Sequence, residues 1–156
     1  MIKEFVKAWE ENKNKLEDYF RNTAQKEYDE YSKIVRKLFE IVINPYLEKL
    51  DKYPLEKGFN VKDMTIVDDG SYQGTQIFII PLNTYQPDIT DYIYTNTYYG
   101  SCSGCDTLLR ITSYNTDRKP DENQIKDYMI LALHLLQKCK WLKEEKQNAS
   151  ISENWR

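Results

Sequence analysis

The sequence predicts one α+β domain spanning residues 1–156, with helices at both ends and an antiparallel sheet between them. Apolar residues recur at helical spacing near the N-terminus and again after residue 121, whereas the region between is rich in β-branched and aromatic residues separated by turn signals. The composition, 40% hydrophobic and 13% aromatic, is typical of a folded protein with a core. The predicted parts are a helical segment (1–57), a sheet with a cysteine turn (58–120), a C-terminal helix (121–146) and a mobile tail (147–156).

The N-terminal segment has two apolar groups, in residues 2–20 and 24–42, that stay roughly in phase at about 100° per residue. No Gly or Pro interrupts them, which favours one long helix over residues 2–43 rather than a helical hairpin. A small sheet cannot cover the whole stripe of such a helix. Its outer half would then need a second helix or another subunit, so self-association through this helix is one expectation.

Asn44 and Pro45 have the residue types of an N-cap and a first helical position. They predict a new short helix that runs through Leu50 and ends before Pro54.

Three strands are predicted in the middle of the chain, at residues 64–67, 75–82 and 92–99. Turn signals at Asp69-Gly70 and around Pro87 separate them, which indicates an antiparallel meander. A period of two places Tyr92, Tyr94 and Tyr98 on one face of the third strand.

The C-terminal helix begins at a capping box, in which Asp121 is followed three positions later by Gln124. Its apolar seam predicts a core helix over residues 122–145, with Cys139 buried in that seam. The tail has no period, and Trp155 is its one candidate for docking.

Cys102 and Cys105 are separated by two small residues in a turn bounded by Gly100 and Gly104. The N-terminal residues resemble an amphipathic helix more than a secretory signal, so a cytoplasmic protein with reduced thiols is expected. Three interpretations stay open: a structural turn shaped by its glycines, a zinc site, or a redox-active pair. Asp106 follows the pair and is expected to cap a short helix.

A zinc site at Cys102 and Cys105 needs further ligands, and Cys139 and His134 are the obvious candidates. On one helix these two lie about 140° apart, so they do not easily converge on one ion. A site of Cys102, Cys105 and either one of them, completed by Asp106 or a water, stays open. We expect no cofactor, with zinc as the alternative.

Charge and missing motifs favour a binding protein over an enzyme. Residues 58–120 carry four basic and seven acidic side chains, while both flanking regions are balanced, so no basic patch for nucleic acid is expected. No phosphate-binding glycine loop or nucleophile elbow is present, and the chain has a single histidine. No run of residues is apolar enough to predict a membrane span.

The segment YGSCSGCDTL (residues 99–108) resembles a motif of small uncharacterised proteins of bacteriophages and prophages. Residues 71–75 and 133–137 are similar to that family too, whereas the N-terminal helical segment is not. The resemblance carries no catalytic residues. It implies an accessory protein made in the cytoplasm of an infected bacterium, where such proteins bind host proteins, including defence nucleases such as CRISPR effectors.

These observations together predict a protein that binds and inhibits or modulates a host protein. An acidic, tyrosine-bearing surface suits a basic target through complementary charge and aromatic anchors. Half-buried packing of the tyrosines is the alternative. The residues expected to bind the partner are Asp68, Asp69, Asp88, Asp91, Tyr92 and Tyr94.

Overall fold

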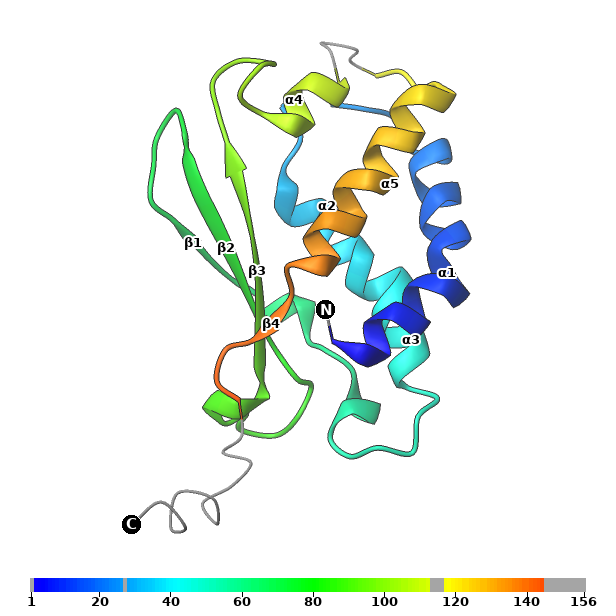
Figure 1. Cartoon of the computed structure of the whole chain (residues 1–156), viewed down its shortest axis with the longest axis vertical. Coiled ribbons are helices and arrows are strands. Elements are labelled where there is room, and N and C mark those ends of the chain that lie inside the picture. Colours follow the sequence, from blue (N-terminus) through cyan, green and yellow to red (C-terminus); the bar gives the residue numbers. More distant parts are fainter. Residues whose placement is uncertain (1, 27, 113–116, 145–156) are drawn as a thin grey trace, which may run out of the picture.

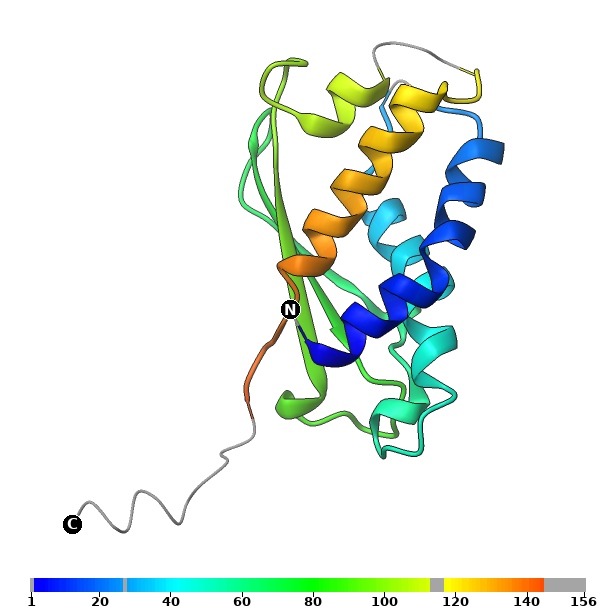
Figure 2. The ribbon, with the colours of Figure 1, turned by 45° about the vertical axis from the view of Figure 1, so that its right-hand side comes forward.

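The computed structural model describes residues 2–26, 28–112 and 117–144, and they form an α+β fold. A four-stranded antiparallel sheet with the order β1-β2-β3-β4 has the longer helices on one of its faces (Figure 1). The view turned by 45° shows the same two layers, with the other face of the sheet free of helices (Figure 2). The predicted tail at 147–156, with Trp155, lies outside the described residues.

The N-terminal segment forms the helical hairpin, which was the alternative, so the preference for one continuous helix over residues 2–43 was wrong. Helix α1 (Lys3–Asn22) ends where Thr23 adopts an extended backbone conformation. The chain then reverses into α2 (Tyr31–Lys37), which continues as a π-helical stretch (Leu38–Ile43) and as α3 (Asn44–Leu47). Two in-phase stripes fit either arrangement, and the hairpin buries each stripe against the other.

The backbone between α1 and α2 is fixed by a distant segment. The Gln25 N–H donates to the Arg118 carbonyl at 2.9 Å, and the Asp117 N–H donates to the Gln25 carbonyl at 2.9 Å. These bonds give the polar backbone groups partners at the reversal, which a continued helix would have supplied internally. The sequence near residue 25 contains no Gly or Pro, so no local signal predicts the turn.

Asn44 does not cap a new helix, contrary to prediction. Ile43 and Asn44 are both helical, so the preceding helix runs on without a break and ends at Leu47. The Asn44 side chain instead accepts from the Phe59 N–H and donates to the Phe59 carbonyl, both at 2.8 Å. It thereby ties the helical layer to the segment that enters the sheet.

The predicted meander is confirmed. The strands are β1 (Thr65–Asp68), β2 (Gly74–Pro81) and β3 (Tyr92–Tyr99), each antiparallel to the next. Short 3-10 turns occupy Leu55–Lys57, Val61–Asp63 and Ile89–Asp91.

The capping box of the C-terminal helix is confirmed, but the helix is shorter than predicted. The Asp121 side chain accepts from the Gln124 N–H and the Gln124 side chain accepts from the Asp121 N–H. Helix α5 covers Glu122–Gln137 and is followed by a fourth strand, β4 (Lys140–Trp141), which pairs with β3. The helix ends at Gln137 because the following residues join the sheet. Trp141 pairs with Ile93 of β3 and packs beside Phe59, at 6.0 Å between ring centroids.

The core lies between the sheet and the helices. Phe78, Ile80 and Ile93 on the sheet are fully buried, and so are Phe5 of α1 and Phe39 of the π-helical stretch. Thr95 is also buried in this layer, where its hydroxyl donates to the Leu135 carbonyl at 2.6 Å. In the part of the chain that the structure describes, no helix is long and apolar enough to cross a membrane.

Candidate functional site

The sheet face turned away from the helices is open. Alternation along β3 turns Ile93 and Thr95 toward the core and leaves Tyr94 and Tyr98 on the opposite side, where Tyr98 is 51% exposed. The neighbouring strands add aliphatic side chains, including Val67, which is 46% exposed. We call this surface the outer face; its members are Thr65, Val67, Thr75, Ile77, Ile79, Tyr92, Tyr94, Asn96 and Tyr98.

The four acidic residues expected to bind a partner lie at opposite ends of the sheet rather than in one patch. Asp68 and Asp69 are at the turn between β1 and β2, next to the end of β3. Asp88 and Asp91 flank the 3-10 turn before β3, at its beginning, where they form a capping box with each other. Tyr92 and Tyr94 lie between these ends on the outer face, and Tyr92 is nearest to Asp91.

Asp68 points to the helix side of the sheet and not to the outer face. Its carboxylate accepts from the Tyr99 hydroxyl at 2.7 Å and from the Gln76 amide at 3.1 Å. The hydrogen bond from the Tyr99 hydroxyl lowers the pKa of Asp68, and bonds from the Gly70 N–H and the Gln76 amide lower it further. The bond between Tyr99 and Asp68 also raises the pKa of Tyr99 to about 12. At neutral pH the pair therefore carries one negative charge.

The structure joins Cys102 and Cys105 in a disulfide, which differs from the expectation of reduced thiols. The turn brings their Cα atoms to 5.4 Å, within the range that a disulfide spans. Gly100 makes the turn possible, since a Cβ there would lie 2.6 Å from the Cβ of Cys105. A Cβ at Gly104 would make only an ordinary contact, 3.9 Å from the Sγ of Cys102, and the backbone angle there is not unusual, so Gly104 does not shape the turn as expected.

Asp106 caps helix α4 (Thr107–Thr112), as predicted, and it also holds the turn to the helical layer. Its carboxylate accepts from the Leu109 N–H at 3.1 Å, from the Gly100 N–H at 3.2 Å and from the Tyr31 hydroxyl at 2.6 Å. Tyr31 is only 4% exposed, and its hydroxyl also accepts from the Leu108 N–H. This carboxylate therefore joins α2, which is distant in sequence, to the end of β3 and the start of α4.

Burial, reinforced by the hydrogen bond to Asp106, raises the pKa of the Tyr31 phenol far above its ordinary value. An unfolded phenol titrates near pH 10, so the stabilisation by neutral Tyr31 is complete below about pH 10 and is lost as the pH rises further. We expect the stability advantage of the native protein over Tyr31→Phe to shrink between about pH 10 and pH 11.5. Chemical denaturation at several pH values measures this, and an advantage independent of pH would contradict it.

A cleft that the sequence did not predict lies between the helix side of the sheet and the beginning of α2. Its volume is about 270 Å³. It combines carboxylates from the loop before α2 and from the cysteine turn with apolar and phenolic walls. We call it the acidic cleft; it is lined by Asp29, Glu30, Tyr31, Ser32, Ile66, Gln76, Tyr99 and Asp106.

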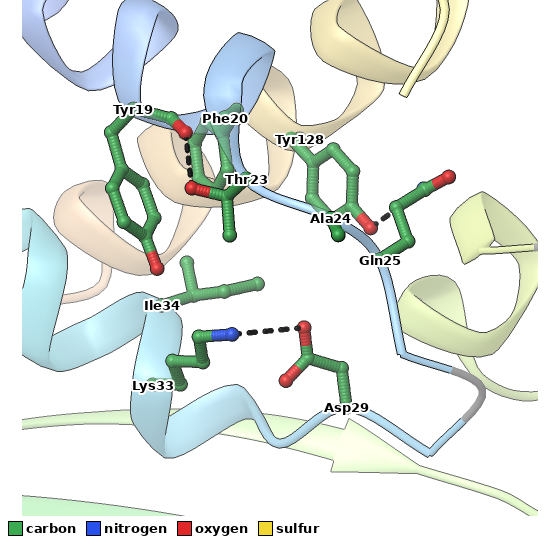
Figure 3. A pocket seen from close by; sticks show the side chains of 9 residues that line it. All are labelled: Tyr19, Phe20, Thr23, Ala24, Gln25, Asp29, Lys33, Ile34 and Tyr128. Carbon is green, nitrogen blue, oxygen red and sulfur yellow. Dashed lines mark hydrogen bonds and ion pairs between the residues drawn. The ribbon is translucent and has the colours of Figure 1, made fainter. Parts of the chain in front are cut away.

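A second hollow, between the end of α1 and α2, is too small for a ligand (Figure 3). Its volume of about 20 Å³ holds roughly one water molecule. Tyr19, Phe20 and Ile34 form its apolar wall, and the Gln25 amide donates to the Tyr128 hydroxyl at 2.9 Å at its edge. This hollow belongs to the packing of the hairpin.

The structure does not bring the candidate zinc ligands together. Cys139 is buried in the core, as predicted, and its Sγ lies 3.5 Å from the Leu135 carbonyl. In the disulfide state neither Cys102 nor Cys105 offers a thiolate. Within residues 2–26, 28–112 and 117–144, no three His, Cys, Asp or Glu side chains lie close enough to hold a metal ion.

Burial raises the pKa of the Cys139 thiol to about 12, so this cysteine should react slowly. After reduction of the disulfide we expect iodoacetamide at pH 8 to label Cys102 and Cys105 of the folded protein at least about 100-fold faster than Cys139. Mass spectrometry of the labelled peptides measures the rates, with the denatured protein as the control in which all three thiols react. Comparable labelling of Cys139 in the folded protein would contradict its burial.

Comparisons with known proteins give no match: no family model, no curated protein and no solved structure matches the chain. The function proposed below is therefore inferred from the surfaces of this chain and from the motif resemblance.

Proposed function

We propose that this protein is a phage-type accessory protein that binds a basic surface of a host protein and inhibits or modulates it. The observation that carries the proposal is the outer face, which lies on the side of the sheet without helices (Figure 2). On this face Tyr98 and Val67 are exposed, and Tyr92 and Tyr94 are half-buried. Large rigid tyrosines with a hydroxyl that tolerates water are frequent anchors of protein interfaces.

The arrangement of charge supports a protein partner with basic residues. Asp69 lies at one end of the outer face, and Asp88 and Asp91 lie at the other, so the apolar centre has acidic ends. Interfaces commonly have an apolar centre and a polar rim, and charges in the rim increase association rates and select the partner. The same charges disfavour direct binding to nucleic acid.

The phage setting comes from the resemblance of residues 99–108 and not from the geometry. Within that setting, defence nucleases such as CRISPR effectors are a suitable target class, because basic residues line the channels in which they hold nucleic acid. An acidic protein that covers such a channel would block access of the nucleic acid.

The test is capture of a partner from the lysate of a bacterial host by the full chain. We expect the double variant Tyr92→Ala/Tyr94→Ala to weaken binding of the captured partner at least about tenfold. Tyr53→Ala is the matched control, since Tyr53 is 76% exposed near α3, far from the outer face, and should leave the affinity unchanged within about twofold. Circular dichroism verifies that each variant is folded.

Salt dependence provides a second readout of the same complex. Because the rim is acidic, the affinity should fall as the ionic strength rises from about 0.05 M to 0.3 M. Failure to retain any partner, or binding that the tyrosine changes leave intact, would contradict the proposed function.

A thiol-redox function is the second candidate, favoured by the disulfide between Cys102 and Cys105. The measurement that separates it from binding is the reduction potential of this pair in a glutathione buffer. A potential well below that of cellular glutathione would make the disulfide structural. Zinc binding by the reduced pair is tested by elemental analysis of protein purified under reducing conditions, and substoichiometric metal would remove it.

Self-association through the N-terminal helix was expected because half of the apolar stripe of one long helix would need another subunit, and that reason no longer holds. The stripe of α1 that would have required another subunit is covered by the protein's own hairpin and by α5.

A further inference from the structure

Within the part of the chain that the structure describes, the outermost strand of the sheet, β1, has one edge without a neighbouring strand (Figure 1). All four of its residues are exposed, and two of them, Ile66 and Val67, are large and apolar. Exposed sheet edges accept further strands unless charge, proline or a covering segment blocks them. β1 contains no proline or lysine, and its one charged residue is Asp68.

The hydrogen-bond phase of the sheet shows which backbone groups face the open edge. The Asp69 N–H donates to the Thr75 carbonyl, and these residues are partners in the register that continues from β1 and β2. In an antiparallel ladder such pairs recur every second residue, so Thr65 and Val67 bond to β2. The N–H and C=O groups of Ile66 and Asp68 therefore point away from β2, and no backbone bond from the described residues reaches them from outside.

The acidic cleft opens beside this edge. Ile66 lies opposite Phe78 of the core, so its side chain is on the helix side, and it lines the cleft together with Gln76 and Tyr99. A strand added along β1 would place alternate side chains on the same side as Ile66. Those side chains would enter the space over the cleft.

The charge of the cleft identifies the side chain that it would accept. Lys33 lies 3.8 Å from Asp29 and partly compensates it. Among the described residues, Glu30 and Asp106 of the cleft have no basic partner within ion-pair distance, and neither has Asp68, which is hydrogen-bonded to Gln76 and Tyr99 of the cleft wall. Since Tyr31 and Tyr99 keep their protons at neutral pH, the cleft is negative, and a lysine or arginine side chain complements it.

We propose that β1 and the acidic cleft form a strand-addition site for an extended segment of a partner protein, with a lysine or arginine side chain in the cleft. The backbone of the segment bonds to Ile66 and Asp68, which supplies affinity, and the basic side chain supplies selectivity. This inference rests on the proposed protein-binding function and adds the kind of segment that is bound. It uses the edge and the helix side of the sheet, whereas the proposed anchors Tyr92 and Tyr94 lie on the outer face.

The direct test uses a fluorescein-labelled peptide of about seven residues that alternates threonine and valine around a central arginine. We expect its anisotropy to rise on titration with the full chain. Two matched peptides should bind at least about tenfold more weakly: one with glutamate in place of arginine, and one N-methylated at alternate residues, which loses its backbone donors. No binding of the arginine peptide up to about 1 mM, or equal binding of the three peptides, overturns the inference.

Variants of the protein test the same site from the other side. Ile66→Pro removes the N–H that faces the open edge without removing a bond to β2, and should abolish binding of the peptide, whereas Ile66→Thr keeps that N–H and should retain most of it. Glu30→Gln should weaken binding of the arginine peptide several-fold, while Glu48→Gln removes the same charge at an exposed position after α3 and should change nothing.

The outcomes for a captured host partner separate this inference from the proposed function. Loss of the partner with Tyr92→Ala/Tyr94→Ala but full retention with Ile66→Pro would uphold the proposed function and overturn strand addition. Light scattering covers a further alternative: a dimer of the chain alone that Ile66→Pro dissociates would assign the edge to a second copy and overturn the inference.

Discussion

Replacing Phe39 by alanine is expected to lower the free energy of unfolding by about 3 to 5 kcal/mol. Phe39 is fully buried in the π-helical stretch, and its ring meets Phe5 and Phe59 edge to face, with centroid distances of 5.9 and 5.5 Å. The change deletes a large apolar side chain and leaves a cavity that three surrounding segments cannot fill. Urea denaturation followed by circular dichroism measures the loss.

This variant also tests the helical hairpin. In one continuous helix Phe5 and Phe39 would be about 50 Å apart and could not share a core. Tyr53→Ala is the control, because Tyr53 is 76% exposed and its loss should change the stability by less than about 0.5 kcal/mol. If Phe39→Ala costs less than about 1 kcal/mol, the hairpin core is not formed as described.

Replacing Asp106 by alanine is expected to lower the free energy of unfolding by about 3 kcal/mol. The carboxylate accepts bonds from Tyr31, Gly100 and Leu109, so its removal leaves a buried hydroxyl and two N–H groups without this acceptor. Hydrogen bonds to a charged group contribute about 1.5 to 3 kcal/mol each and are not additive when they share an atom. Thermal and urea denaturation measure the change.

A double-mutant cycle isolates the contact between the cysteine turn and α2. Tyr31→Phe should cost about 1 to 2 kcal/mol alone, and clearly less in the background of Asp106→Ala, because the shared bond is already lost. Asp18→Ala is the control: Asp18 is exposed on α1 and should change the stability by no more than about 0.5 kcal/mol. Fully additive costs would show that Tyr31 and Asp106 do not stabilise each other.

The strands and the C-terminal helix were predictable because their signals are local. The alternation of buried and exposed residues in 92–99 is typical of a half-exposed strand. The Asp121–Gln124 capping box stabilises a helix through hydrogen bonds between residues only three positions apart. The helical hairpin was not predictable from such signals. Its reversal depends on backbone bonds from Gln25 to Asp117 and Arg118, nearly a hundred residues away.

The candidate surfaces, too, were only partly predictable from the sequence. The sequence placed Tyr92 and Tyr94 on one face, since alternation alone decides that. The predicted meander also implies that Asp68 and Asp88 lie at opposite ends of the sheet, because successive antiparallel turns do. Only the register of the sheet shows that Asp68 points to the helix side and not to the outer face. Likewise, the sequence could not locate the acidic cleft, whose walls come from the loop before α2, from β1 to β3 and from the cysteine turn.

The sequence by itself determined the α+β class, the antiparallel meander, the buried seam of α5 and the cap at Asp106, because each follows from residues close together in the chain. Only the tertiary structure decided that α1 folds back on α2, that Lys140 and Trp141 form a fourth strand, and that one sheet face and one strand edge stay open. The physical reason is that burial and backbone pairing between distant segments select among local conformations of similar energy.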